Sequence, residues 1–211
     1  MTLVAVDCHM VGQAAAGDAG NGRYARTLVA AMAATAREDD VVASLVASPE
    51  GARALEGFGP THGVPSADVP RLARAAPRAL SDLGAEAAVF TYVSPGWVPC
   101  PILLAVHDAT FMTNPEWLGA RARTVLRGLV PRAARKAARV LALSETAARD
   151  VAAALRIDPG KVRVVSPYPD PAFTPAEERA RLADEGRRRA AAFTWARTAE
   201  GIVAAHREVA G

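Results

Sequence analysis

The chain has 211 residues, of which 51% are hydrophobic and 22% charged, so it can bury a core and is not a disordered tail. Aromatic residues make up only 5%, which favours closely packed helices rich in Ala, Val and Leu over an aromatic-rich β-sandwich. The net charge of +3 comes from basic residues that are almost all Arg, and no basic run alternates with aromatic residues as a nucleic-acid groove requires. We therefore expect no nucleic-acid partner.

The first half of the sequence alternates short apolar runs with helical patterns. Apolar residues 3–6 end at Asp7 and indicate a buried strand. A glycine-rich loop then leads into a predicted helix over 22–37. Further strands are expected over 41–47, 87–90 and 102–106, and helical patterns lie between them over 51–55 and 69–83.

The next stretch predicts a long helix, a strand and a capped helix. A helical pattern covers 115–138, although Pro131 inside it should kink the helix or divide it. A strand over 140–143 follows. Ser144 after it is a good N-cap for a helix that reaches Leu155.

The character of the sequence changes after the last predicted strand, at 162–165. Residues 166–175 hold four prolines and should form an extended strap. One or two helices are expected over 176–209, and Thr194 could cap the last of them.

These elements predict an α/β fold with a doubly wound parallel sheet. The strands are continuously apolar rather than alternating, which is typical of a sheet covered by helices on both faces. We expect a Rossmann-like domain over 1–170, and a Pro-rich strap with C-terminal helices packed on that domain over 171–211.

Several polar or flexible segments follow predicted strands. Because the carboxyl ends of parallel strands meet at one edge of a sheet, these segments should form the floor of a ligand cleft. They are the loop around Gly17, His107-Asp108, Ser144-Glu145 and residues 167–170.

Cysteine usage and hydropathy indicate a reducing compartment and no membrane span. Cys8 and Cys100 lie in no C-x-x-C pair, so we expect no metal site and no disulfide. Residues 1–7 indicate a first strand rather than a signal peptide, and no run approaches the roughly 18 apolar residues of a membrane span. The sequence predicts a cytoplasmic protein without an integral membrane segment and without a cofactor.

Four stretches resemble bacterial family 4 glycosyltransferases of the GT-B fold, and they occur in the order typical of that family. The first runs from Asp7 to Tyr24, with Gly22-Arg23-Tyr24 opening a helix. The second is 104–111, a strand that ends in His107-Asp108. The third is 138–146, and the fourth is 158–166. The segment 186–199, with Phe193-Thr194-Trp195, is similar to the element that opens the final crossover helix in such enzymes.

The resemblance also indicates what this sequence does not contain. Family members carry a second Rossmann-like domain between the strap and the final helices, and it holds the nucleotide-sugar donor. Here Pro175 leads almost directly into the C-terminal helices, and no Glu pair in a donor-loop context is found. The sequence is therefore similar to an acceptor-binding domain with its crossover helix, truncated by loss of the donor domain.

The resemblance implies a parent reaction that transfers a sugar from a nucleotide-sugar to an acceptor. Without the donor domain, we expect this chain to bind a small-molecule sugar acceptor but not to turn over, so its status as an enzyme is uncertain. The alternative is an interaction module that dimerises, or pairs with a separate donor-domain chain, through its exposed interdomain face.

The loop with Gly17, Gly20 and Gly22 has two interpretations. Glycines let the backbone approach a ligand, and the amides of a helix N-terminus attract anions, so the loop could bind substrate. The same glycines could instead provide only a flexible connection. The spacing is G-x-x-G-x-G, which differs from the dinucleotide fingerprint and disfavours a nicotinamide-binding domain.

His107 and Asp108 are the predicted catalytic-site residues. The resemblance implies that His107 lies beside the transferred sugar, whereas a lone His can also be a satisfied core residue. Asp108 could accept a hydrogen bond from an acceptor hydroxyl, or it could cap a turn. We assign neither as a general base.

The remaining candidates have competing structural explanations. Ser144 and Glu145 could face the cleft, but capping alone explains Ser144. Arg23 could meet an acidic acceptor, and His9 lies near the same predicted cleft. Other side chains could bind a sugar or simply pack: Tyr24 and Trp195 are assigned to packing, and Trp97 and Trp117 could either stack on a sugar or fill gaps in the core.

Overall fold

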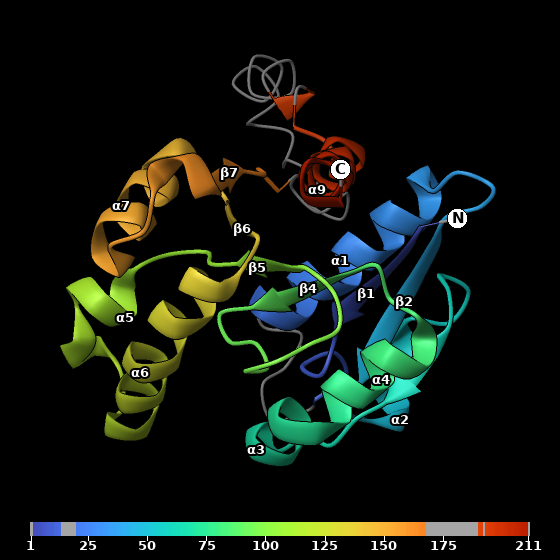
Figure 1. Cartoon of the computed structure of the whole chain (residues 1–211), viewed down its shortest axis with the longest axis horizontal. Helices are drawn as coiled ribbons and strands as arrows, with labels where there is room; N and C mark the ends of the chain where they lie inside the picture. The colour runs from blue at the N-terminus through green and yellow to red at the C-terminus, as the bar shows by residue number, and fades with distance from the viewer. Residues whose placement is uncertain (1, 14–19, 168–189, 192, 211) are drawn as a thin grey trace, which may run out of the picture.

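A seven-stranded parallel sheet is the centre of the computed structural model, which describes residues 2–13, 20–167, 190–191 and 193–210. Its order is β3-β2-β1-β4-β5-β6-β7, so the chain winds outward in both directions from β1 and β4 (Figure 1). This is the predicted doubly wound α/β fold. The strands are β1 (Leu3–Asp7), β2 (Val41–Val46), β3 (Thr61–Gly63), β4 (Ala87–Thr91), β5 (Ile102–Ala105), β6 (Arg139–Ala142) and β7 (Val162–Val164).

The register brings the carboxyl ends of the strands to one edge. Val6 of β1 pairs with Ser44 of β2 on one side and with Val89 of β4 on the other. On the far side of β4, Thr91 pairs with Ala105 of β5. The strand order reverses between β1 and β4, and ligands of open α/β sheets bind near such a switch point.

Helices cover both faces of the sheet. One face carries α3 (Asp68–Pro70), the single π-helical turn η1 (Arg71–Ala75), α4 (Ala76–Leu83), α5 (Thr110–Thr113), α6 (Ala120–Lys136) and α7 (Glu145–Leu155). The other face carries α1 (Gly20–Thr35), α2 (Pro49–Ala54) and α9 (Trp195–Ala210). Two 3-10 turns, η2 (Pro115–Trp117) and η3 (Pro159–Lys161), complete the described elements.

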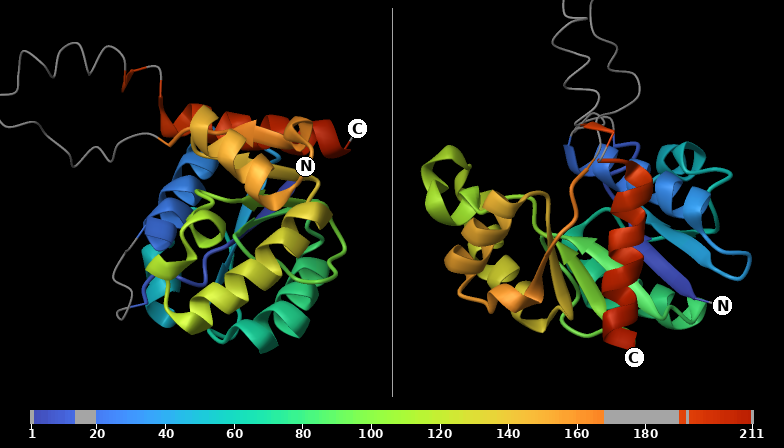
Figure 2. Two further views of the ribbon diagram at one scale, coloured as in Figure 1. Left: turned by 90° about the vertical axis from the view of Figure 1, so that its left-hand side faces the viewer. Right: turned by 90° about the horizontal axis from the view of Figure 1, so that it is seen from above.

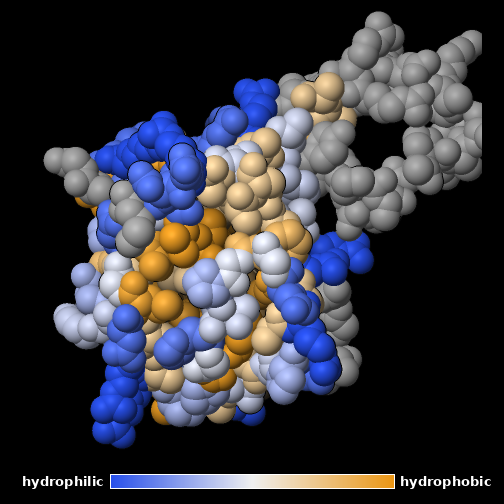
Figure 3. Space-filling view, turned by 90° about the vertical axis from the view of Figure 1, so that its right-hand side faces the viewer, coloured by the Kyte–Doolittle hydropathy of each residue, from blue (hydrophilic) through white to orange (hydrophobic). Residues whose placement is uncertain are grey.

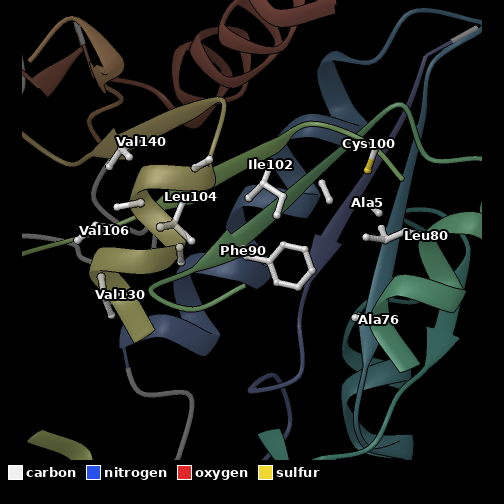
Figure 4. Packing of buried hydrophobic residues seen from close by; sticks show 14 of the residues in the cluster. Ala5, Ala76, Leu80, Phe90, Cys100, Ile102, Leu104, Val106, Val130 and Val140 are labelled. Atoms are coloured by element: carbon white, nitrogen blue, oxygen red, sulfur yellow. The ribbon is translucent and has the colours of Figure 1, made fainter. Parts of the chain in front are cut away.

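Two apolar clusters fill the layers between sheet and helices. On the α4 and α6 side, Phe90 of β4 and Ile102 of β5 lie among small residues such as Ala76, as Figure 4 shows. On the α1 side, Leu28 and Met32 pack on the strands. Closely packed aliphatic side chains thus fill most of the core in place of aromatic residues, as predicted.

The final helix packs on the domain across its first helix. α9 runs along α1 and reaches β5 and β6, and it buries Ala199, Ile202 and Ala205. In Figures 1 and 2 it lies over the sheet, and the two ends of the chain lie at the same end of the molecule. This confirms that C-terminal helical structure packs on the sheet, whereas the Pro-rich strap and the predicted boundary at 170–171 fall outside the described residues.

A shallow hollow lies where α1, α9 and the amino ends of β1 and β2 meet. It measures about 230 Å³ and is lined by apolar residues such as Val42 and Val203 and by the buried His206. Figure 3, which views the side that carries β2, shows apolar residues gathered at the centre of that surface. The hollow lies at the opposite edge of the sheet from the predicted cleft.

The short helix α5 was not predicted, and two other elements also differ from the predicted ones. β3 was not predicted, because Thr61-His62-Gly63 is a short, partly exposed edge strand without an apolar run. The predicted helix over 115–138 begins only at Ala120, since Leu118 and Gly119 adopt extended backbone angles after η2. Pro131 lies inside α6 and does not divide it.

Candidate functional site

Aromatic rings surround His107 at the carboxyl end of β5. The Tyr24 ring on α1 lies 4.5 Å from the imidazole between centroids, and the Tyr92 ring, just after β4, lies 5.5 Å away. Both meet the imidazole edge to face, at 66°. Tyr24 also lies 6.0 Å from the ring of Trp195, the first residue of α9. The fold thus brings together four residues that lie far apart in the sequence, namely Tyr24, Tyr92, His107 and Trp195.

Three polar atoms of this cluster have no hydrogen-bond partner among the described residues. They are His107 Nε2, Tyr24 Oη and Trp195 Nε1, and all three are shielded from solvent. Buried polar atoms in folded proteins are nearly always paired. An aromatic cluster with three unused polar atoms offers the apolar faces and the hydrogen-bonding groups with which proteins bind polar ligands such as sugars.

The imidazole of His107 is neutral at physiological pH. Burial lowers its pKa to about 4, although the neighbouring Asp108 raises it in part. A neutral imidazole carries one donor nitrogen and one acceptor nitrogen, so His107 can orient a hydroxyl without binding a proton from solvent.

The carboxylate of Asp108 is fixed by two hydrogen bonds. Tyr92 Oη donates to Oδ2 at 2.8 Å, and the backbone N–H of Thr110 donates to Oδ1 at 2.8 Å. Burial raises the pKa of Asp108, but these hydrogen bonds lower it by more, so that the net shift is downward. The bond to Thr110 is the turn cap that the sequence allowed, and the side chain is still exposed to solvent.

Tyr92 adopts a backbone conformation that few residues tolerate. Its φ of 60° lies in the left-handed region, which costs a non-glycine residue roughly 1–3 kcal/mol. Its N–H donates to Ala105 O at 2.8 Å, and this bond holds the turn next to β5. The strained backbone directs the phenol towards both Asp108 and His107.

A buried ionic cluster lies beside this site, at the end of β1. Asp7 Oδ2 accepts a hydrogen bond from Arg71 Nη1 at 2.5 Å, and Asp7 Oδ1 lies 3.1 Å from His9 Nδ1. Arg71 is 1% exposed and also donates to Asp68 at 2.6 Å. Sequence reasoning missed Arg71 because it is one of many arginines in a helical pattern, and only the fold brings it to Asp7. His9 is thereby held at the same sheet edge as the predicted cleft.

The glycine loop is only partly described. Gly17 lies outside the described residues, whereas Gly20 begins α1 and Gly22 is buried in its first turn. A Cβ on Gly22 would lie 3.0 Å from the Met10 carbonyl oxygen, so this glycine permits α1 to start close to the loop after β1. Arg23 next to it is exposed.

The other predicted site residues do not join the aromatic cluster. Ser144 is the N-cap of α7, and its Oγ accepts from the Ala147 N–H at 3.1 Å, as predicted. Glu145 begins the same helix and lines a hollow between α7 and β7. Both follow β6, the strand next to β5. Trp97 and Trp117 are 70% and 71% exposed, so the idea that they fill gaps in the core is wrong.

The remaining polar chemistry of the described residues is sparse. Both cysteines are free and buried, and burial raises the pKa of Cys100 to about 11. No three His, Cys, Asp or Glu side chains gather there into a set that could bind a metal ion. None of the described helices is both long enough and apolar enough to cross a membrane.

Comparison with known proteins finds likeness only among solved structures. No protein-family model and no curated protein matches. Sucrose-phosphate synthase from Thermosynechococcus elongatus superposes with a TM-score of 0.58 at 16% identity, over 87% of this chain and 53% of that one. HepE from Anabaena, in complex with UDP and glucose, superposes with a TM-score of 0.51 at 15% identity, over 88% and 50%.

These likenesses establish the fold. The chain has a Rossmann-like α/β fold of the type found in GT-B glycosyltransferases. It spans about half the length of the solved structures that it matches.

Proposed function

We propose that this chain is the acceptor-side half of a family 4, GT-B glycosyltransferase and that it binds a sugar acceptor at the carboxyl edge of its sheet. The observation that carries the proposal is the His107 cluster, which unites three unused polar atoms with aromatic rings on a GT-B type of fold. The match to only half of each solved structure supports a truncated domain. Transfer of a sugar then requires a donor half that this chain does not supply.

In this proposal His107 positions substrate and does not act as a base. A pKa near 4 makes the imidazole a weak proton acceptor, and the lowered pKa of Asp108 makes its carboxylate weaker still. His107 Nε2 and Tyr24 Oη would instead hydrogen-bond to sugar hydroxyls, and Asp108 would accept from the acceptor. Alignment of the reactants is the contribution of this half.

The donor in the complete enzyme is a nucleotide-sugar. HepE, whose fold this chain shares, was solved with UDP and glucose. Stabilisation of the leaving diphosphate needs cationic or amide groups that point at it, and these belong to the missing half. The chain alone should therefore bind free nucleotides weakly or not at all.

Two titrations test the proposal. In the double variant Trp97→Phe, Trp117→Phe, Trp195 is the one tryptophan that remains of three, so its fluorescence reports on the cluster directly. The two replaced side chains are exposed, so their replacement should not disturb the core. We expect glucose, galactose or maltose to change this emission with a midpoint in the millimolar range, and UDP or GDP to release no heat in calorimetry at millimolar concentration.

The control distinguishes the site from bulk effects. His107→Ala in the same background should abolish the sugar response, whereas His62→Ala, at the β3 edge of the sheet, should leave it intact. Micromolar binding of UDP would contradict the missing donor half. A sugar response that survives His107→Ala would contradict the proposed site.

An interaction module is the second candidate, and one observation favours it. Trp117 follows the carboxyl end of β5 and is 71% exposed, and Phe193 before α9 is 43% exposed. Large exposed apolar side chains near this edge suit a partner such as a second copy or a separate donor-domain chain. Sedimentation of the chain alone distinguishes the two, since a stable dimer would favour the module.

A further inference from the structure

An apolar groove lies on the α6 side of the sheet, and neither His107 nor its aromatic neighbours line it. It measures about 460 Å³ and is bounded by α3 and η1 on one side, by α6 on the other and by the loop after β4. Val69 on its wall is 78% exposed and Leu129 is 43% exposed. Trp97, which directly follows Gly96 in the wall, is 70% exposed. Surface side chains this large and this exposed rarely gather on a protein without a partner.

The helix that forms one wall of the groove is strongly basic. Within Ala120–Lys136 there are six basic residues and no acidic one. Helical spacing places Arg121, Val125, Leu129, Arg132 and Lys136 on one stripe, and the last three line the groove. Arg135 also lines it, so cations and apolar side chains lie next to one another along the same wall.

Acidic side chains offset little of the positive charge at the groove. Asp68 is the one acidic residue in its lining, and its carboxylate is paired with the buried Arg71. Lys136 Nζ donates to Gly96 O at 2.9 Å and Arg132 donates to Gly128 O, both backbone carbonyls without a net charge. The groove therefore presents uncompensated positive charge beside exposed Val, Leu and Trp side chains.

We propose that this groove and the α6 stripe dock on an anionic lipid bilayer. Lipid phosphates would meet Arg132, Arg135 and Lys136, while Val69, Leu129 and Trp97 enter the boundary between headgroups and acyl chains. A polyanion such as nucleic acid would meet the cations but leave these apolar side chains in water. A lipid surface satisfies both, and this inference is independent of the proposed sugar site.

Vesicle flotation of the full chain tests the proposal. Vesicles of phosphatidylcholine with about one third phosphatidylglycerol should bind the chain at low salt, and vesicles of phosphatidylcholine alone should not. Each cation removed near the membrane surface lowers binding about five-fold, so Arg132→Ser with Arg135→Ser should lower it roughly thirty-fold. Raising the salt to 0.5 M should lower binding as well, because it screens the charges.

Matched variants distinguish docking at the groove from a general effect of surface charge or hydrophobicity on vesicle binding. Val69→Ser should weaken binding, whereas Phe58→Ser, which removes an apolar side chain that is 36% exposed and lies outside the groove, should not. Arg37→Ser with Arg207→Ser removes two cations from the hollow on the α1 and α9 face of the sheet and should leave binding unchanged. Thermal unfolding monitored by circular dichroism verifies that each variant is folded.

Three results would overturn the proposal. Equal binding to neutral and anionic vesicles would remove the electrostatic basis. Equal loss in the groove variants and in their matched controls would remove the location. A dimer in sedimentation that Val69→Ser converts to monomer would identify the groove as a contact between two copies of the chain.

Discussion

The polar atoms around His107 belong to residues that are far apart in the sequence. Tyr24, Tyr92 and Trp195 each come from a different element, and only the parallel sheet with α1 and α9 on one face brings them together. Burial of His107 Nε2, Tyr24 Oη and Trp195 Nε1 without a partner among the described residues typically costs about 1–3 kcal/mol for each group. Three of the six such atoms among the described residues lie in this one cluster, so hydrogen-bonding capacity is concentrated there.

The titration of His107 should make stability depend on pH. Its folded-state pKa of about 4 lies below the ordinary value of 6.5. Above pH 6.5 the imidazole is neutral in both states. Between pH 6.5 and 4 only the unfolded chain binds the proton, so stability is lost as the pH falls through this window, by roughly 3 kcal/mol at most.

Urea unfolding at pH 7 and at pH 4.5 measures this dependence. Carboxylates also lose stabilising contacts in acid, so the comparison is with His107→Gln, which keeps a polar side chain but does not titrate. The wild type should lose about 2 kcal/mol more than the variant over this range. An equal loss in both would show that His107 is solvated in the folded protein.

Sequence reasoning singled out His107 and Asp108 as site residues, which stays a prediction, and it assigned their neighbours incompletely. Tyr24 and Trp195 do pack in the core, as expected, yet each also carries an unpartnered polar atom beside the imidazole or its neighbour. A helical stripe predicts that a side chain is buried, but it does not predict what the tip of that side chain meets. Arg71 and its ion pair with Asp7 depend on contacts across 64 positions and could not be predicted.

At the scale of elements, capping explains why several helices begin where they do. Ser48, Ser144 and Asp158 each precede a helix or helical turn and accept a hydrogen bond from a backbone N–H inside it. Thr194 does the same for α9, where Arg197 N–H donates to Thr194 Oγ1 at 3.1 Å. The predicted caps at Ser144 and Thr194 are both confirmed, because this signal is local.

Removal of the α7 cap should destabilise the fold measurably. Ser144→Ala loses the hydrogen bond from Ala147 and should lower the free energy of unfolding by about 1 kcal/mol. Ser144→Asp keeps an acceptor and adds a charge that suits a helix N-terminus, so it should match the wild type or exceed it. Urea denaturation checks both, and equal destabilisation by Ala and Asp would contradict a capping role.

Strong apolar runs predicted six of the seven strands, and the exception has a physical cause. β3 has exposed or partly exposed side chains and is held by ladder bonds to β2 rather than by burial. The start of α6 was placed too early because Pro115 is compatible with a first helical turn, and here it begins only a 3-10 turn. Backbone breaks at Leu118 and Gly119 leave no clear pattern in the sequence.

At the scale of the whole molecule, α9 completes the core on the α1 side. Ala199, Ile202 and Ala205 are buried against the cluster that includes Val4, Val6 and Leu141. The salt bridge between Arg163 and Glu208, at 2.9 Å, is partly exposed and adds little by comparison. Apolar burial therefore holds the final helix in place.

Truncation of one α9 side chain should test that dependence. Ile202→Ala creates a cavity in a fully buried site and should lower the free energy of unfolding by about 2–5 kcal/mol. Val203→Ala, on the partly exposed side of the same helix, should cost clearly less. Thermal unfolding compares the two, and similar losses would mean that α9 is only loosely attached.

Because α9 packs against α1, the fold cannot be completed until α9 has been synthesised. The first strand and helix are made early, but the apolar face that they share with β5 and β6 is covered only when residues 195–210 have been made. Until then Val6, Leu103 and Leu141 are without part of their covering, which makes the nascent chain prone to aggregation. The domain can thus mature only after the sixteen residues of α9 have left the ribosome and packed against α1.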